Sequence, residues 1–495
     1  MKQRSIQTTL LVLLMGIAGC VVAHAQDPQE AYREFVRNRK TEMENWRTKA
    51  NAEFSTYLSE AWSEFKILQG KENPMAPVDE KPTYYPGTEP IRGKVKGAGL
   101  PADLEGLCAV LFPEMISHPE EPGTGFDRGA GQVEFDFYGR KVMLPFDETM
   151  CLSYLSAKER DVAQAWSKLG NASFDVTLKA IQDFSNKYAL NGWANYMLIK
   201  RMTEAIYADS QVNERLLTQM FFLCQLQYRV RVGSAGSSLV LLMPFQEPIY
   251  QVPYISDGGQ DLFIFSSSPL SSQTPLYTFT RDFSNANNLI SLAFDTPIML
   301  GNEDTYRMVT LPLWADLIGE SVEVPVNAAQ IEFVYDYPQT DLPLYHKSAV
   351  NQETSKKVLR SVKYQILARQ LSEVEAVSYI LSLVQKGFEY KTDYEMFGRA
   401  KPLFVEESIY YGANNCKDRV LLFSWLVREI LGLKTVMFGY PNHVSCGVAF
   451  TQPVQGDVFS FEGKQYWVCD PTYIGAPIGA SMPRYAGTEP VIVRM

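Results

Sequence analysis

The sequence predicts an α+β protein of several domains: an N-terminal amphipathic helix, a mixed domain of helices and strands, and a C-terminal core in which a buried helix packs on an antiparallel sheet. Apolar residues recur mostly every three or four positions in residues 27–70, which is typical of a helix. Short apolar runs between turn residues favour strands across residues 240–335. A nearly all-apolar helical run, residues 420–431, is followed directly by strand-like segments. A chain of 495 residues is longer than one typical domain, so two or three are expected.

The N-terminus has the features of an export signal. Lys2 gives a positive start, residues 10–22 are apolar, and Ala25 ends a small-x-small cleavage motif. A second interpretation is a lipoprotein signal, in which Cys20 would be lipidated and would anchor the protein to the outer membrane. Both predict an exported protein of the periplasm or cell envelope. No later run reaches the roughly 18 apolar residues that span a bilayer.

The charge balance argues against one class of partner. The formal net charge is −10, and removal of the leader with Lys2 and Arg4 would leave −12. A non-specific nucleic-acid binder needs a basic face, and the sequence has no Lys/Arg cluster. We therefore expect no nucleic-acid partner.

Cysteine spacing leaves disulfides open and disfavours a metal. Export permits disulfides, and Cys108 with Cys151 is the first pair to test. Cys446 and Cys469 fall on one face of a predicted hairpin and could also pair, whereas buried free thiols are the alternative for both pairs. With no C-x-x-C motif and three His after the leader, no metal or other cofactor is expected.

Residues 26–70 are predicted to be one amphipathic helix or a broken pair. Its stripe is rich in aromatic residues, so it is either an arm that docks a protein partner or a helix packed on the protein's own body. Repeated Pro makes residues 71–102 a linker.

Residues 103–350 read as the mixed domain. Helical patterns occupy residues 158–231, with Asn171 or Ser173 as caps, and strands follow, the last at residues 331–335. Residues 214–233 share with residues 419–439 a pattern of apolar helix, short strand, Gly and second strand. This echo suggests a decayed copy of the C-terminal domain, although coincidence between common patterns is the alternative.

Residues 351–495 form the C-terminal domain. Residues 352–388 are helical, and Ser372 and Glu375 have the spacing of a capping box. A loop rich in aromatics, residues 388–412, then leads to the apolar helix. Gly432 ends that helix, and strands are expected at residues 434–440 and 443–450.

Three residues in this domain suit a thiol nucleophile. Cys416 opens the apolar helix, where the helix dipole favours thiolate over thiol. His443 begins a strand, and Asp470 follows another strand before Pro471. A hairpin whose loop is residues 451–464 would bring His443 opposite Asp470. That set supplies nucleophile, base and orienting acid.

The segment resembles the transglutaminase-like superfamily, which is papain-related in fold. The likeness rests on Cys416 with Asp418 two residues later, on His443 at a strand start, and on Asp470-Pro-Thr after Tyr466-Trp467. It covers about residues 370–485. Many relatives have an acidic residue directly before the Cys, whereas this chain has Asn415.

The resemblance implies a Cys416-His443-Asp470 triad that transfers acyl groups from peptide or protein amides. The backbone N–H of Cys416 is the natural oxyanion donor. Tyr410, Tyr411 and Asn414 are candidates for a second one, and Asp418 is expected to cap the helix or orient its neighbours. Hydrolysis is favoured over cross-linking because water is always present. The alternative is a non-catalytic envelope scaffold or binding protein that keeps the fold.

Overall fold

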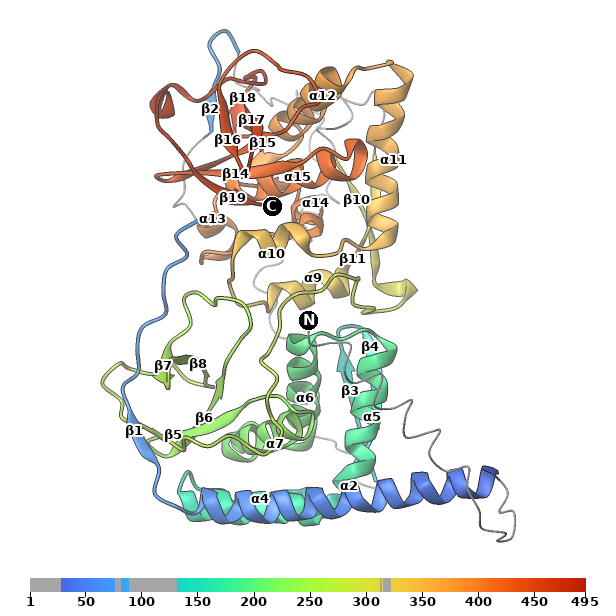
Figure 1. Cartoon of the computed structure of the whole chain (residues 1–495), viewed down its shortest axis with the longest axis vertical. Coiled ribbons are helices and arrows are strands. Elements are labelled where there is room, and N and C mark those ends of the chain that lie inside the picture. The colour runs from blue at the N-terminus through green and yellow to red at the C-terminus, as the bar shows by residue number, and fades with distance from the viewer. Residues whose placement is uncertain (1–27, 76–81, 89–130, 312–313, 315–321) are drawn as a thin grey trace, which may run out of the picture. The chain divides into compact units, whose positions relative to one another are not determined.

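The computed structural model describes residues 28–75, 82–88, 131–311, 314 and 322–495. Its contacts divide into two units, one ending at Glu53 and the other beginning at Phe54. The second unit combines helices with several antiparallel sheets (Figure 1), which confirms the α+β class at this coarse level. The expected export signal, with the alternative lipidation site Cys20, lies outside the described residues, as does Cys108, the first candidate to pair with Cys151.

The N-terminal helix α2 (Pro28–Leu58) is shorter than predicted. After it, β1 (Ser63–Phe65) pairs antiparallel with β9 (Leu276–Thr278), and Leu68 forms a β-bridge with Tyr254. The helix prediction was therefore wrong from residue 59 onward. Apolar spacing alone did not reveal this edge strand, because its backbone partners lie far along the chain.

The predicted helical stretch, residues 158–231, contains four helices joined by turns. Ser173 occupies the N-cap position of the second without a side-chain cap bond, and Asn171 is the last residue of the first. The four helices are α4 (Glu159–Asn171), α5 (Phe174–Lys187), α6 (Gly192–Ile206) and α7 (Val212–Gln225).

The helix α7 packs on an antiparallel sheet of order β1-β9-β5-β6-β8-β7. The apolar cluster of this sheet includes Val240, Leu242 and Leu262. The remaining strands are β5 (Arg231–Ala235), β6 (Ser238–Met243), β7 (Tyr254–Asp257) and β8 (Gln260–Phe265).

Residues 331–335, predicted as a strand, belong instead to helix α9 (Ala328–Tyr335). The side chain of Asn327 accepts a hydrogen bond from the backbone N–H of Ala329, and this cap starts the helix. Two hairpins complete the region, β3 (Gln132–Phe137) with β4 (Arg140–Pro145) and β10 (Tyr306–Thr310) with β11 (Glu323–Asn327). The short 3₁₀ helices are η2 (Glu148–Met150), η3 (Glu303–Thr305) and η4 (Pro483–Tyr485).

The C-terminal domain is built around the predicted apolar helix. The Ser372–Glu375 capping box is confirmed, because each residue's backbone N–H bonds to the other's side chain. Residues 388–412 are not a plain loop, since they hold a short strand and two helices. The elements are α10 (Leu342–Lys347), α11 (Gln352–Ala368), α12 (Glu373–Lys386), β12 (Glu389–Tyr390), α13 (Asp393–Phe397), α14 (Val405–Tyr411), β13 (Ala413–Asn414) and α15 (Cys416–Leu431).

The helix α15 packs on an antiparallel sheet of order β16-β17-β15-β14-β19 (Figure 1). The segment 451–464, expected as a hairpin loop, contains β16, which pairs with the outer edge of β17. The strands are β14 (Thr435–Tyr440), β15 (His443–Val448), β16 (Val458–Phe461), β17 (Lys464–Cys469) and β19 (Val491–Arg494).

The described part of the Pro-rich linker contains a strand that the sequence did not predict. Strand β2 (Thr83–Tyr84) pairs in parallel with β18 (Tyr473–Ile474) of the C-terminal domain. Residues 82–88 therefore contact the domain that carries the candidate triad.

The two large sheets share one strand order. In each, a buried helix is followed by four strands in the order first-second-fourth-third, and a later strand pairs antiparallel with the first. The first hairpins turn at Ala235↔Ser238 and at Tyr440↔His443. This order agrees with the echo in the sequence, and it places Ser238 where the C-terminal domain has His443.

Candidate active site

Cys416 is the first residue of α15. Asn415 caps the helix, and its backbone N–H lies 3.3 Å from Oδ2 of Asp418 in a reciprocal capping box. The N-terminus of a helix carries a partial positive charge. Cys416 is 3% exposed, so the sulfur lies inside the domain.

His443 begins β15, directly after the turn from β14. Its Nε2 lies 2.8 Å from Oδ2 of Asp470, and both residues are buried. The β15–β17 ladder ends at the pair Cys446↔Cys469. His443 and Asp470 therefore meet diagonally on one sheet face, rather than directly opposite as the sequence suggested.

Asp470 is held by the chain on both sides of it. Its Oδ1 accepts backbone hydrogen bonds from Thr472 at 2.8 Å and Tyr473 at 3.2 Å. Its backbone carbonyl accepts a 3.0 Å bond from Nε2 of Gln385. These bonds leave Oδ2 to orient the ring of His443.

The electrostatics of His443 favour the imidazolium. Burial works against the charged ring, but Asp470, through its charge and hydrogen bond, and the Cys416 thiol outweigh it and raise the pKa of His443 to about 10. The other ring nitrogen, Nδ1, is buried and makes no hydrogen bond of normal geometry within the described residues. With Nε2 on Asp470, Nδ1 is the nitrogen left to exchange a proton with Cys416.

Two aromatic rings stack over the imidazole, and no sequence pattern predicted either contact. The ring of Tyr485 lies 5.3 Å from that of His443 with a 4° angle between their planes, and Tyr440 lies 4.8 Å from Tyr485. The hydroxyl of Tyr485 donates to the carbonyl oxygen of Pro441 at 3.0 Å. This stack fixes the plane of the imidazole and keeps water from its face.

Two unsatisfied donors lie near Cys416. Tyr390 and Asn414 are partners in the parallel β12–β13 pair, and the structure shows no bond for the hydroxyl of Tyr390 or the amide nitrogen of Asn414 within its described ranges. Burial raises the pKa of Tyr390, as does the charge of Cys416, whereas the Cys416 backbone N–H lowers it. The effect of the Cys416 backbone N–H on this pKa means that the Tyr390 hydroxyl lies beside the Cys416 amide.

The candidates Tyr410 and Tyr411 have a different neighbourhood. Both lie on α14, where their rings contact each other at 5.2 Å and Tyr411 also contacts Phe397 at 5.3 Å. Of the residues considered from the sequence, Asn414 has the better position for an oxyanion. Sequence reasoning missed Tyr390, because only strand pairing brings it to Asn414.

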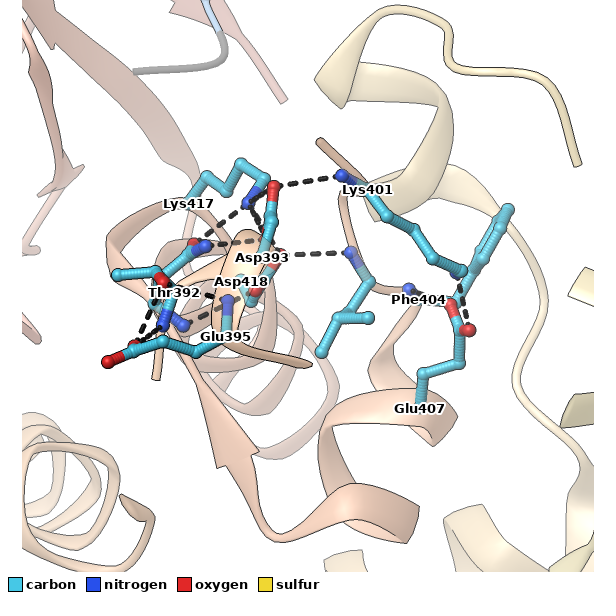
Figure 2. Close-up of polar contacts among 10 residues, drawn as sticks. Thr392, Asp393, Glu395, Lys401, Phe404, Glu407, Lys417 and Asp418 are labelled. Carbon is cyan, nitrogen blue, oxygen red and sulfur yellow. Dashed lines mark hydrogen bonds and ion pairs between the residues drawn. The ribbon is translucent and has the colours of Figure 1, made fainter. Parts of the chain in front are cut away.

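A buried ionic cluster supports the start of α15 (Figure 2). Nζ of Lys417 lies 2.6 and 2.8 Å from the two oxygens of Asp393, which also accepts from the side chain of Asn415 at 2.7 Å. Asp418 accepts from the backbone N–H of Leu403 at 2.9 Å, and burial raises its pKa to about 7. The cluster fixes the segment before α14 to the first turn of α15, in keeping with the orienting role expected of Asp418.

Arg419 connects α15 to the loop that carries Asp470, because one terminal nitrogen of its guanidinium donates to the carbonyl oxygen of Pro471 at 3.4 Å. Its Nε donates to Oδ1 of Asn414 at 3.0 Å, and its terminal nitrogens donate to the carbonyl oxygens of Gln385 at 3.1 Å and Phe388 at 2.8 Å. Its guanidinium lies 5.3 Å from the ring centre of Tyr390. One buried cation thus sets the relative positions of both candidate donors.

The suggested Cys446–Cys469 disulfide is not present. The two residues face each other across the β15–β17 pair, yet both are free thiols. Burial raises the pKa of each thiol. They are therefore poor nucleophiles in the folded protein.

Comparison with protein-family models and with curated proteins found no match for the chain. Within the described ranges, no three His, Cys, Asp or Glu side chains gather as a metal ion would require. None of the described helices combines the length and apolar character of a membrane span.

Proposed function

We propose that this protein is a cysteine-dependent amide acyl-transfer enzyme of the transglutaminase-like type, with a papain-related core. One observation carries the proposal: His443 is bound to Asp470 at 2.8 Å through Nε2, and Nδ1 is left for a thiol at the start of a buried helix. In this proposal the nucleophile comes from α15, the base from β15 and the orienting acid from the residue after β17.

The proposed reaction has two halves. Cys416 gives its proton to Nδ1 of His443, and the thiolate attacks the carbonyl carbon of an amide. His443 then returns the proton to the leaving amine as the C–N bond breaks, which leaves a thioester on Cys416. In the second half His443 takes a proton from water as the water oxygen attacks the thioester carbonyl. The C–S bond then breaks, His443 returns the proton to the sulfur of Cys416, and the acid leaves.

The oxyanion formed in each half needs fixed donors. We assign the backbone N–H of Cys416, the amide of Asn414 and the hydroxyl of Tyr390 to this role. Both side-chain donors are buried and lack partners in the described structure, and a developing negative charge would supply the missing acceptor.

Hydrolysis is the favoured outcome. A thioester that reacts with water needs no second binding site, whereas cross-linking requires an amine to be held beside Cys416. We further propose that the protein is exported to the periplasm or cell envelope, by cleavage after Ala25 or by lipidation at Cys20, and that peptide or protein amides are its substrates.

The test is the rate at which iodoacetamide labels Cys416 across pH, read by mass spectrometry. The wild type should label near pH 6 far faster than an ordinary thiol with a pKa of about 8.5, and His443→Ala should lose that excess. The buried thiols of Cys446 and Cys469 provide internal controls that should stay unlabelled. An ordinary rate that does not depend on His443 would overturn the proposal.

A second candidate is a non-catalytic envelope protein that binds a partner through α2. The observation in its favour is that this helix leaves large apolar side chains in solvent, among them Tyr32 (68% exposed), Phe35 (56%) and Met43 (53%). Isolated exposed apolar residues are common, but a row on one helix marks an interaction surface. Truncation of residues 26–53 should abolish partner binding under this candidate and leave the labelling of Cys416 unchanged.

A further inference from the structure

The loop after Asp470 offers a short strand edge, and the chain itself fills it. Residues Tyr473 and Ile474 of β18 pair in parallel with Thr83 and Tyr84 of β2. The backbone N–H of Tyr85 adds a 2.9 Å hydrogen bond to the carbonyl oxygen of Ile474. Extended peptides bind other proteins in this way, by adding a strand to a free edge.

Side chains reinforce the backbone pairing. The ring of Tyr85 packs at 5.5 Å and 61° against that of Tyr473. Thr88 lies against Gly475, which has a φ of 81°, and a Cβ at that glycine would collide with the threonine side chain. Tyr85 and Thr88 are the ends of a turn, in which the backbone N–H of Thr88 donates to the carbonyl oxygen of Tyr85 at 2.9 Å. The edge therefore accepts a two-residue strand followed directly by a turn, with an aromatic residue at the start of the turn and a small hydroxyl residue at its end.

The filled edge is next to the triad. The backbone N–H of Tyr473 donates to Oδ1 of Asp470 at 3.2 Å. A strand that pairs with β18 therefore contacts a residue that is itself bonded to the orienting acid. Burial lowers the pKa of Arg419 to about 10, and Cys416, Tyr84 and Asp470 are among the groups that oppose this shift. Tyr84 thus shares the surroundings of Arg419 with two triad residues.

The segment lies at the surface, whereas the triad does not. Tyr84 is 39% exposed and Tyr85 is 37% exposed, but Cys416, His443 and Asp470 are each at most 3% exposed. A peptide amide cannot reach a sulfur so enclosed. Some part of the structure must move before Cys416 can react, and a two-residue strand held at the surface opens at a low cost in free energy.

We propose that the β18 edge is the binding strand for an extended peptide substrate, and that residues 82–88 occupy it in the described chain as an internal competitor. This proposal rests on the proposed function for the reaction at Cys416, whereas the pairing of residues 82–88 with β18 does not depend on that function. A peptide with an aromatic residue placed to meet Tyr473 would displace the segment and bind in parallel to β18 in its place.

The test compares the iodoacetamide labelling rate of Cys416 in the wild type and in Tyr85→Pro. This substitution removes both the N–H that bonds Ile474 and the ring that packs on Tyr473. The rate is read at a pH of about 10, where an ordinary thiol is already ionised, so that it reports access rather than activation. A rise of about fivefold is expected, the factor that loss of one hydrogen bond of ordinary net strength gives.

A synthetic peptide with the sequence of residues 82–88 should return the Tyr85→Pro rate toward the wild-type value, and a scrambled peptide should not. The control variant Tyr364→Ala removes another exposed tyrosine, on α11, and should leave the rate unchanged. If Tyr85→Pro does not fold, the double variant Tyr84→Ala/Tyr85→Ala gives the same comparison.

Two results would overturn the proposal: a variant rate equal to the wild type, or equal protection by the two peptides. Neither bears on the proposed function, which is judged by the excess labelling near pH 6 and its loss in His443→Ala. The two failures are therefore distinguishable.

Discussion

The side-chain amide nitrogen of Gln385 lies 3.0 Å from the backbone carbonyl oxygen of Asp470 and connects α12 directly to the orienting acid of the candidate triad. The same nitrogen also donates to the carbonyl oxygens of Tyr473 and Ala476, and Oε1 accepts from the N–H of Gly475. One buried side chain thus holds the chain from Asp470 to Ala476, which includes β18. Its own backbone carbonyl accepts from Arg419, which extends the connection to α15.

Gln385→Leu should therefore disturb both stability and the site. It leaves buried backbone groups without partners, and the free energy of unfolding should fall by about 2–4 kcal/mol, since each such group costs about 1–3 kcal/mol and the costs do not simply add. Urea unfolding measures this change. The folded variant should also label more slowly at Cys416 near pH 6. Gln352→Leu, at an exposed position of α11, is the matched control, and equal losses in the two variants would contradict the role given to Gln385.

Lys417→Met tests the buried cluster beside Cys416. Lys417 is 1% exposed and its partner Asp393 7%, so the substitution leaves a buried carboxylate without its cation. Breaking such a pair from one side costs about 3–5 kcal/mol. The double variant Lys417→Met/Asp393→Asn should recover part of that loss. Urea unfolding of these two variants, of Asp393→Asn alone and of the wild type forms a double-mutant cycle that gives the coupling.

The control for this cycle is Lys356→Met, which breaks a pair with Glu353 that is more than half exposed on both sides. This substitution should lower the free energy of unfolding by less than about 1 kcal/mol, because exposed ion pairs contribute little to stability. Similar losses for Lys356→Met and Lys417→Met would show that burial does not set the energy of the Lys417 pair.

The sequence was sufficient to find the elements whose signals are local. The apolar run after Cys416, the Ser372–Glu375 box and Gly432 gave α15 and α12 with bounds close to those observed. His443 and Asp470 were expected to meet, and they do, because alternation along two strands places both on one sheet face. What the pattern could not give was the register, which ends at Cys446↔Cys469 and makes the contact diagonal.

The parts that sequence reasoning missed depend on contacts between distant segments. Tyr390 reaches Cys416 only through pairing with Asn414, and Tyr485 reaches His443 only by stacking. Neither contact leaves a periodic trace in the chain. Residues 331–335 were predicted wrongly for a local reason. Their apolar pattern fits a strand or a helix, and the N-cap at Asn327 starts a helix here.

Tyr390→Phe tests the assigned oxyanion donor. Loss of one donor from an oxyanion site lowers kcat by about 10²–10³, and we expect the lower end because the Cys416 amide and Asn414 remain. The fall in kcat is measured by the turnover of a peptide amide. Thiolate formation does not use this hydroxyl, so the labelling rate of Cys416 should stay at the wild-type value.

Tyr364→Phe, which removes a hydroxyl from an exposed tyrosine, is the control for that comparison. An unchanged kcat in Tyr390→Phe would remove Tyr390 from the mechanism. A fall in labelling that matches the fall in kcat would instead mean that the hydroxyl acts on the thiol.

The raised pKa of His443 predicts how stability depends on pH. The pKa rises from 6.5 to about 10 on folding, so the folded protein binds this proton more tightly than the unfolded chain does. The resulting stabilisation is complete below about pH 6.5 and is lost as the pH rises toward 10, at up to about 1.4 kcal/mol per pH unit. Urea unfolding of the wild type and His443→Gln measures it, because the difference between them cancels the other titrating groups. The stability advantage of the wild type should shrink steadily between pH 7 and 10. An advantage that is constant over this range would contradict the raised pKa of His443.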